Sequence, residues 1–418
     1  MRKVKSLIIG AGVSGLAYGS QCEGTYLIVE KEKVPGGFCR TFHQDGYVWD
    51  YAGHFFHFAT EEIRNYFESR IPKEELVCCN KNTKIFYKGQ YIDYPFQKNI
   101  HQLPKEEFID CLYDLHFREQ QESYKNFEGM LYGKFGKSIT EKFLKPYNEK
   151  LYACDLNTLD ADAMGRFFPY ASETDIIGNM RQSSGKSYND TFEYPKDGAQ
   201  RFVDVLLEDI NRENLLLGVS VEQIDKEERI ALLSNGEQVT YQYLINTIPF
   251  NRFIDISFPE ESKWKQAVFS ANKVVVFNLG FDKKSEVEDI HWIYYPEKKY
   301  CFYRVGFYNH ILGMDKMSLY VELGCKSDEN SDENILLQRV LEDLRKCKIV
   351  SGQQLQSYNC LEMNPAYVHI TEESNQCVKE MFRKMEFYGM YSIGRYGGWK
   401  YCSIEDCILD AVSLAKRL

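Results

Sequence analysis

The chain has 418 residues, of which 44% are hydrophobic, and this length predicts two or three domains. Its formal charge of −10 argues against a nucleic-acid surface, so an anionic ligand would need locally placed arginines. The 13 cysteines are scattered without CxxC pairs or Cys/His runs, which predicts free thiols and no metal site. Its apolar runs are too short to span a bilayer and a predicted strand begins the chain, so we expect a cytoplasmic protein with no integral membrane segment.

The first predicted elements are a strand, a tight turn, a helix and a second strand that ends on an acid. The strand at residues 7–9 runs into a G-x-G-x-x-G turn at Gly10, Gly12 and Gly15. Gly10 permits the turn, Gly12 lets the backbone approach a pyrophosphate, and Gly15 lets the helix pack closely on the sheet. The second strand ends at Glu30, where a carboxylate can hold an adenosine ribose hydroxyl. Together these elements predict a dinucleotide site.

The rest of the chain predicts alternating helical and strand-rich stretches. In chain order we expect a helix at 61–76, a hairpin of strands 84–87 and 90–94, several helices between 105 and 165, a loop at 170–190, mixed helix and strand at 202–248, strands at 272–325, a helix at 332–347 and a final helix from about Ser403. A dinucleotide fold built from the first, middle and last thirds of the chain makes the other domains insertions between its strands.

A second cofactor signal follows Glu30. Residues 36–41 read GGFCRT, and residues 48–58 read VWDYAGHFFHF. Both stretches resemble the family of FAD-dependent oxidoreductases that includes amine oxidases, protoporphyrinogen oxidases and UDP-galactopyranose mutases. The resemblance implies FAD as the cofactor, with Arg40 meeting a phosphate charge and His54 contacting the flavin. The cofactor-binding residues expected from the pattern and the resemblance are Gly10, Gly12, Ser14, Gly15, Glu30, Gly37, Arg40, His54, Val221, Arg395 and Ser403.

The fold class expected is α/β, with a discontinuous Rossmann-like FAD-binding domain, an inserted helical domain and an antiparallel β-sheet substrate domain. The FAD-binding domain is expected at 1–75, 190–255 and 365–418. A helical domain that forms a lid over the substrate is expected at 100–189, and the sheet domain at 76–99 and 256–364.

The C-terminal region resembles the mutase branch of that family. Residues 394–401 read GRYGGWKY, similar to the G-R-x-G-x-W-K-Y element of UDP-galactopyranose mutases, and residues 94–97 and 146–152 resemble two uridine-binding stretches. Tyr152 stands where Trp is usual in the second stretch. The substrate-binding residues implied are Tyr94, Phe96, Gln97, Asn148, Tyr152, Arg166, Asn189, Tyr294, Arg304, Tyr367 and Tyr401. The catalytic residues implied are His54, Arg166, Arg304 and Arg395.

The resemblance implies an isomerase that interconverts UDP-galactopyranose and UDP-galactofuranose for cell-surface glycan synthesis, through an adduct between the sugar and N5 of reduced FAD. NADPH or NADH is the expected reductant, a UDP-sugar is the expected partner, and a homo-oligomer is compatible with the sequence. Because one fold carries many reactions, three alternatives stay open. They are a mutase for another nucleotide sugar, an amine or protoporphyrinogen oxidase-like oxidoreductase, and a binding protein that holds FAD structurally.

Overall fold

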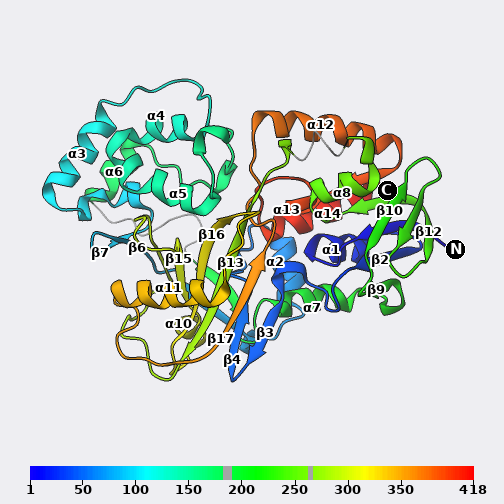
Figure 1. Cartoon of the computed structure of the whole chain (residues 1–418), viewed down its shortest axis with the longest axis horizontal. Coiled ribbons are helices and arrows are strands. Elements are labelled where there is room, and N and C mark those ends of the chain that lie inside the picture. The colour runs from blue at the N-terminus through cyan, green and yellow to red at the C-terminus, as the bar shows by residue number, and fades with distance from the viewer. Residues whose placement is uncertain (182–190, 262–266) are drawn as a thin grey trace.

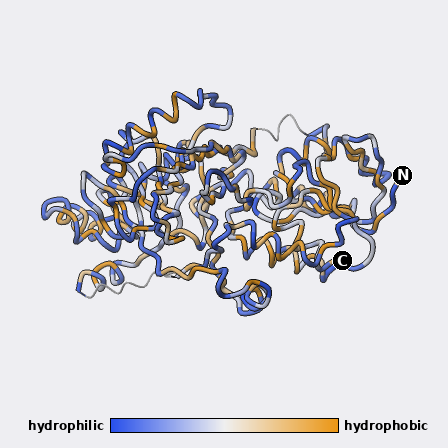
Figure 2. Tube along the Cα trace, turned by 90° about the horizontal axis from the view of Figure 1, so that it is seen from below, coloured by the Kyte–Doolittle hydropathy of each residue, from blue (hydrophilic) through white to orange (hydrophobic). Residues whose placement is uncertain are grey.

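The computed structural model describes residues 1–181, 191–261 and 267–418, and it has an α/β fold with two large sheets. One sheet and both chain termini lie at one end of the long axis, and helices α3 to α6 lie at the other end (Figure 1). The second sheet lies between them, with helix α11 against its outer side. Figure 2 shows that apolar segments run through the interior of both ends, while many outer loops are hydrophilic.

The first sheet is built around parallel strands from the beginning, the middle and the end of the chain. Its order is β10-β11-β12-β1-β2-β9, and β18 also pairs with β12. β1 pairs in parallel with β12 and β2, and β2 with β9, whereas β10 and β11 are antiparallel additions. The strands are β1 (Arg2–Ile9), β2 (Tyr26–Glu30), β9 (Leu215–Leu217), β10 (Val221–Asp225), β11 (Ile230–Leu233), β12 (Gln238–Asn246) and β18 (Met390–Ser392). This order confirms the discontinuous Rossmann-like sheet that the sequence predicts.

Both faces of this sheet are covered, because successive side chains on a strand point to opposite sides. Ile8 packs with apolar residues of α1 (Val13–Gln21), α7 (Gln200–Glu208) and α14 (Ile404–Arg417). Leu7 and Ile9 belong to the core cluster on the opposite face, which includes residues of α8 (Phe250–Ser257) and α12 (Glu372–Phe387). The turn after β1 therefore lies at the edge of a sheet that is packed on both faces.

The second sheet has the order β17-β13-β16-β15-β14-β6-β7 and is antiparallel except where β14 pairs with β6. Its strands are β6 (Thr83–Tyr87), β7 (Gln90–Asp93), β13 (Asn272–Phe281), β14 (Trp292–Tyr294), β15 (Arg304–Phe307), β16 (Ser318–Lys326) and β17 (Leu355–Met363). All residues of β13 are buried, since Val275 and Phe277 pack in the cluster containing α11 (Glu333–Lys346) and Val274 and Val276 pack in the other. A sheet covered on both faces gives rigid support to side chains at its strand ends.

The remaining elements surround these sheets. The helices are α2 (Glu61–Glu68), α3 (Lys105–His116), α4 (Phe127–Ile139), α5 (Lys145–Tyr152), α6 (Glu173–Arg181), α10 (Tyr308–Leu312) and α13 (Gly394–Gly397). A single π-helical turn, Thr140–Leu144, joins α4 to α5. Two small antiparallel pairs are β3 (Thr41–Gln44) with β4 (Tyr47–Asp50), and β5 (Leu76–Asn80) with β8 (Thr191–Pro195).

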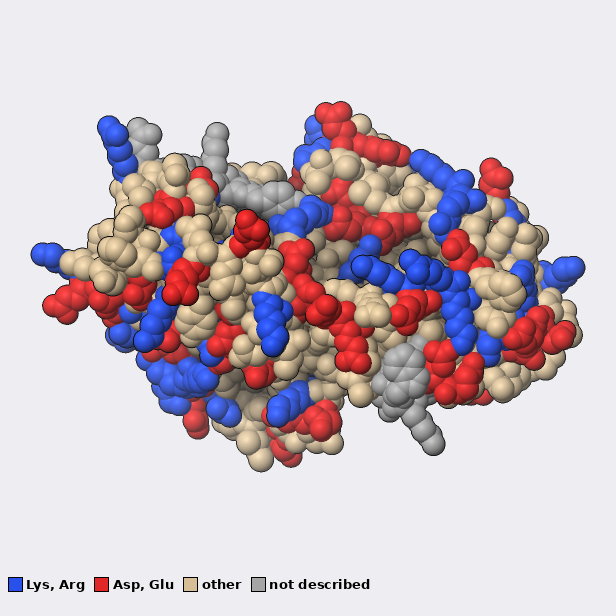
Figure 3. Space-filling model, turned by 90° about the horizontal axis from the view of Figure 1, so that it is seen from above, with Lys and Arg blue, Asp and Glu red and all other residues tan. Residues whose placement is uncertain are grey.

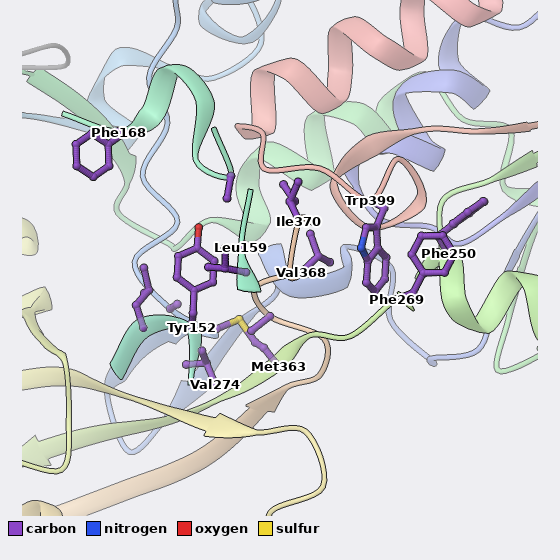
Figure 4. Close-up of a cluster of buried hydrophobic side chains, with 14 of the residues drawn as sticks. Tyr152, Leu159, Phe168, Phe250, Phe269, Val274, Met363, Val368, Ile370 and Trp399 are labelled. Atoms are coloured by element: carbon purple, nitrogen blue, oxygen red, sulfur yellow. The ribbon is translucent and has the colours of Figure 1, made fainter. Parts of the chain in front are cut away.

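The helical region, the second sheet and the C-terminal region share one buried cluster (Figure 4). Tyr152 of α5 lies in it with Val274 of β13 and Met363 of β17. Phe250 of α8 and Trp399 extend the same cluster toward the first sheet. The expected domain boundaries stay a prediction, but the regions they separate have a common core.

Two predicted elements differ from the structure. Residues 173–181, expected in a loop, form α6, which starts where Ser172 donates to the Asp175 carboxylate and which buries Ile176. The helix expected at 61–76 ends at Glu68, and Pro72 prevents a continuous helix to residue 76 because proline and its predecessor resist helical geometry. The hairpin of β6 and β7, the helix α11 and the final helix α14 are confirmed.

Acidic and basic side chains both cover much of the face seen from above (Figure 3).

Candidate active site

The turn after β1 forms a cradle of bare backbone. Gly10 has φ +102°, and a Cβ on Gly15 would lie 2.0 Å from the Gly10 carbonyl oxygen, so both positions require glycine. A Cβ on Gly12 would meet only the Gly37 Cα, 4.0 Å away. Gly12 is also the N-cap of α1 and no side chain caps that helix end, so its first amide groups face the cradle. An open space lined by backbone amides at a helix N-terminus fits a dinucleotide diphosphate.

Glu30 lies at the edge of the cradle, as predicted, but its carboxylate is already hydrogen-bonded. Oε2 accepts from the Ala11 amide at 2.7 Å and Oε1 from the Glu32 amide at 2.9 Å. The Val219 amide donates to the Glu30 carbonyl at 3.0 Å, which brings the segment before Val221 to the same edge. Each carboxylate oxygen keeps a lone pair for a ribose hydroxyl.

Three other predicted cofactor residues lie around the cradle. Arg40 donates to the Gly37 carbonyl at 2.9 Å and to the Tyr51 hydroxyl at 2.6 Å, so it also fixes the glycine loop. A Cβ on Gly394 would lie 2.1 Å from the Ser14 hydroxyl, so the C-terminal segment lies directly against α1. Ser403 serves as the N-cap of α14, where it exchanges hydrogen bonds with Asp406. Its hydroxyl caps the helix, and its contact with the cofactor stays a prediction.

A second group of side chains, the tyrosine cluster, gathers where the helical region meets the second sheet. It consists of Tyr94, Tyr147, Tyr152, Tyr294, Tyr303, Tyr367 and Tyr401. Tyr294 lies 5.2 Å from Tyr94 and 5.1 Å from Tyr147 between ring centroids, and Tyr367 stacks on Tyr401 at 6.0 Å. Burial, and then the neighbours Tyr294 and Tyr401, raise the pKa of Tyr94, so its hydroxyl remains a proton donor. Residues from five separate chain segments therefore converge, as the resemblance implies for Tyr94, Tyr152, Tyr294, Tyr367 and Tyr401.

Arg304 of β15 enters this cluster in a fixed orientation. Its guanidinium makes a two-point contact with the Glu322 carboxylate, through Nε to Oε2 and through Nη2 to Oε1 at 2.6 Å. Glu322 lies on the neighbouring strand β16, directly opposite Arg304, and its side chain is only 1% exposed. The pair places a neutral unit in the site, with the remaining guanidinium hydrogens available to a ligand.

Arg395 lies on the other side of the cluster and differs in its partners. Its guanidinium lies 4.4 Å from the Tyr401 ring centroid and 5.3 Å from that of Tyr367, and Nη1 donates to the Cys402 carbonyl at 3.1 Å. In the described part of the chain, no carboxylate forms an ion pair with it. Arg395 is thus a partly buried cation whose charge is balanced by aromatic faces and a carbonyl alone.

His54 is close enough to both Arg304 and Arg395 for their charges to affect its pKa. Its Nδ1 is buried and finds no hydrogen-bond partner among the described residues. Burial, followed by the charges of Arg304 and Arg395, lowers the pKa of His54 to about 4. The imidazole is therefore neutral near pH 7 and has a nitrogen available for a ligand.

Four of the residues expected to receive uridine, Phe96, Gln97, Asn148 and Tyr152, are buried. Phe96 is 0% exposed and stacks on Phe143, which in turn stacks on Tyr147 of the cluster. The Gln97 and Asn148 carbonyl oxygens and the Tyr152 hydroxyl are buried without partners among the described atoms. These polar atoms fit a ligand with several hydrogen-bonding groups.

Arg166 lies at the surface, apart from the Arg304 pair. It bonds Asp406 at 2.6 Å, its side chain is 50% exposed, and it lines a 260 Å³ cavity with Tyr401, Cys402 and Lys400. Its link to the site therefore runs through Tyr401. Asn189, also expected to bind substrate, lies outside the described residues.

Glu322, like Tyr147 and Tyr303, is a site residue that the sequence analysis did not name. It interrupts an apolar strand, Leu319 to Leu323, and a charged residue in a buried strand requires a partner. That signal was present, but only the β15–β16 register identifies Arg304 as the partner.

Residues 24–418 match the family of flavin-containing amine oxidoreductases. The chain belongs to that family. Membership supports FAD as the cofactor, in agreement with the glycine cradle.

Solved structures with the same fold include proteins of different activity. A reduced UDP-galactopyranose mutase superposes with a TM-score of 0.93 and 22% identity, covering 100% of this chain and 94% of that chain. A cyclohexylamine oxidase from Brevibacterium oxydans has a TM-score of 0.71 and 14% identity over 99% of both chains. A fatty acid isomerase from P. acnes has a TM-score of 0.68 and 13% identity, covering 99% of this chain and 98% of that chain. These likenesses establish the fold.

No helix within residues 1–181, 191–261 and 267–418 is both long and apolar enough to cross a membrane.

Proposed function

We propose that the protein is an FAD-dependent isomerase that interconverts UDP-galactopyranose and UDP-galactofuranose. Family membership supports the flavin, and the fold of the reduced mutase, with its TM-score of 0.93, supports this branch of the family. The polar tyrosine cluster supports a substrate rich in hydroxyl and phosphate groups.

The observation that carries the proposal is the environment of Arg395. A partly buried guanidinium without a carboxylate partner in the described chain favours an anion supplied by a ligand. The hydroxyls of Tyr367 and Tyr401 add donors beside it, and arginine suits phosphate oxygens because its donors form a planar fork. A nucleoside diphosphate provides that charge and geometry.

The other residues have roles consistent with this substrate. Bound FAD supplies the reactive ring that such an isomerisation needs. Arg304, fixed by Glu322, and Tyr294 bind the diphosphate from the sheet side and stabilise it as it leaves the sugar. His54, neutral at physiological pH, positions the ligand by a hydrogen bond and does not act as a general acid. The buried oxygens of Gln97 and Asn148 are acceptors of the kind that a uracil N–H requires.

The test is chromatographic conversion of UDP-galactopyranose by the FAD-loaded, dithionite-reduced protein. We expect UDP-galactofuranose to form without net consumption of reductant. Arg395→Ala should lose conversion and UDP binding, whereas Arg417→Ala should keep both, because Arg417 covers the surface ring of Tyr391. A reduced, flavin-loaded protein that leaves UDP-galactopyranose unchanged and does not bind UDP would refute the proposal.

An amine oxidase-like activity is a second candidate, because the family match and the cyclohexylamine oxidase fold favour it. Anaerobic addition of cyclohexylamine distinguishes the two. An oxidase loses its oxidised-flavin absorbance on addition of the amine alone, whereas the proposed isomerase requires an added reductant.

The nucleotide is tested separately. UDP should protect the reduced protein from thermal unfolding more strongly than dTDP does. The opposite order would indicate a mutase for another nucleotide sugar.

A further inference from the structure

Lys150 lies on α5, but its ammonium group binds the backbone of a different element. Nζ donates to the Tyr295 carbonyl at 2.7 Å, to the Glu297 carbonyl at 3.3 Å and to the Phe302 carbonyl. All three acceptors belong to the turn at residues 295–303 that joins β14 to β15. An ammonium has three hydrogens, and each has an acceptor here.

This turn separates two residues of the proposed substrate site. Tyr294, the last residue of β14, is paired across the hairpin with Arg304, the first residue of β15. The Tyr295 amide donates to the Tyr303 carbonyl at 2.9 Å and closes the hairpin at its base. The turn is therefore connected directly to the two residues whose side chains form the sheet side of the proposed substrate site.

The backbone of α5 is firmly attached to the sheet, so Lys150 starts from a fixed point. A Cβ on Gly324 of β16 would lie 2.0 Å from the Lys150 carbonyl oxygen, which shows how closely the helix approaches the strand. Asn272 of β13 donates to the Leu151 carbonyl at 2.6 Å, and a His369 ring nitrogen lies 2.9 Å from the Tyr152 carbonyl. The helix end is thus held by three contacts that do not involve the Lys150 side chain.

The same helix presents substrate-site residues on its other positions. Tyr147 makes an edge contact with Tyr294, and Asn148 has the buried unpartnered oxygen. We propose that Lys150 is a positioning residue for UDP, which sets the distance between the uridine-binding side of α5 and the Tyr294–Arg304 pair. This inference rests on the proposed function and adds to it a residue that touches neither substrate nor cofactor.

Lys150 is partly buried and bonds backbone carbonyls instead of a carboxylate. Burial lowers the pKa of Lys150 to about 7, and Cys301, Asp343, Glu297 and Arg339 are the titratable groups that face it. Asp343 accepts from the Cys301 amide at 2.8 Å and holds the turn from the opposite side. The turn is therefore hydrogen-bonded to both helices, to α5 through Lys150 and to α11 through Asp343.

The experiment compares Lys150→Met, Lys150→Arg and the wild type as FAD-loaded proteins. UDP binding is measured by calorimetry, and amide exchange of residues 295–303 by mass spectrometry. We expect Lys150→Met to keep its flavin, weaken UDP binding by about tenfold or more and speed exchange in the turn. Lys150→Arg, which keeps the charge and several donors, should recover most of the affinity.

Lys298→Met is the matched control. Lys298 lies in the same turn and also contacts α5, through Glu149 at 3.0 Å, but its side chain is 74% exposed. An exposed pair contributes little, so this variant should bind UDP within about twofold of the wild type. If Lys150→Met does not accumulate as folded protein, Lys150→Gln, which retains two donors, is measured in its place.

The outcomes separate the two claims. If the wild type binds UDP, and Lys150→Met or Lys150→Gln has the same UDP affinity and the same amide exchange in the turn, the role of Lys150 is overturned. The proposed function then still stands. Failure of the wild type to bind UDP overturns the proposed function and this inference with it. A loss in Lys298→Met equal to that in Lys150→Met also overturns the inference, because any contact between the turn and α5 would then serve.

Discussion

The glycine cradle and the tyrosine cluster serve one site but are built by opposite means. The cradle is made of backbone, and it exists because Gly10, Gly12 and Gly37 bring no side chains into the space beside α1. The cluster is made of large side chains whose polar ends converge from distant segments. The cradle is therefore sensitive to atoms that are added, and the cluster to polar groups that are removed.

The largest effect is expected for an added methyl group at Gly15. Its Cβ would lie 2.0 Å from a backbone oxygen, which cannot move without disturbing β1, so Gly15→Ala should yield no folded flavoprotein. Gly12→Ala is the matched variant, because its Cβ meets nothing nearer than 4.0 Å. We expect it to fold with normal circular dichroism but to lose visible flavin absorbance. A yellow Gly15→Ala protein would contradict the role given to the close approach.

The next effect concerns a group removed from the cluster. Glu322→Gln leaves Arg304 buried without its counter-charge, and breaking such a pair typically costs about 3–5 kcal/mol. Denaturant unfolding should show this loss. The double variant Arg304→Met, Glu322→Gln should be more stable than Glu322→Gln alone, since no unpaired charge remains. Equal stability of the two variants would show that the charge is solvated.

A smaller, pH-dependent effect is expected at Asp50, which lies between the two regions. Its carboxylate accepts from Thr41, Tyr194 and the Ala199 amide, yet burial raises its pKa from 3.8 to about 7. Its stabilising contribution is therefore full below the unfolded pKa and is lost as pH rises through about 7.

Asn cannot ionise, so the stability advantage of wild type over Asp50→Asn should be greater at about pH 5 than at about pH 8. Thermal unfolding of both proteins across this range measures the difference. His54, whose pKa is about 4, also lowers the stability of the folded protein at acid pH. This loss occurs in both proteins and cancels in the comparison. An advantage that grows with rising pH would reverse the sign and contradict the raised pKa.

The smallest effect is expected for Arg166→Ala. The Arg166–Asp406 contact is half exposed, and exposed pairs contribute about 0–1 kcal/mol, so the melting temperature should barely change. Flavin content should also be retained, while UDP affinity falls less than in Arg395→Ala. A loss as large as that of Arg395→Ala would place Arg166 within the cluster when ligand is bound.

The cradle was predictable from sequence because its determinants are local. A glycine at a fixed offset from a strand end and an acid at the end of the next strand define the turn with little help from the rest of the chain. Gly10, Gly12, Gly15, Gly37 and Glu30 accordingly lie together.

The cluster could not be assembled by the same reasoning. Tyr94, Tyr294 and Tyr401 are far apart in sequence, and only the resemblance to a known family associated them. The pairing of Glu322 with Arg304 depends on the β15–β16 register, and the burial of Phe96 depends on its stacking with Phe143. Both are tertiary facts without a local signal. The short helix α6 was missed because its formation depends on burying Ile176 against distant residues.

The packing of α14 against α1 has a consequence for how the protein is made. The helix that follows the glycine turn is covered by residues 404–417, and β18, which completes the parallel strands, ends only at Ser392. Both segments are synthesised long after the glycine turn, so the turn lacks this cover while the residues between them are being made. A truncation before Ile404 should therefore leave α1 without this packing partner and lower flavin binding, although every glycine of the turn is present.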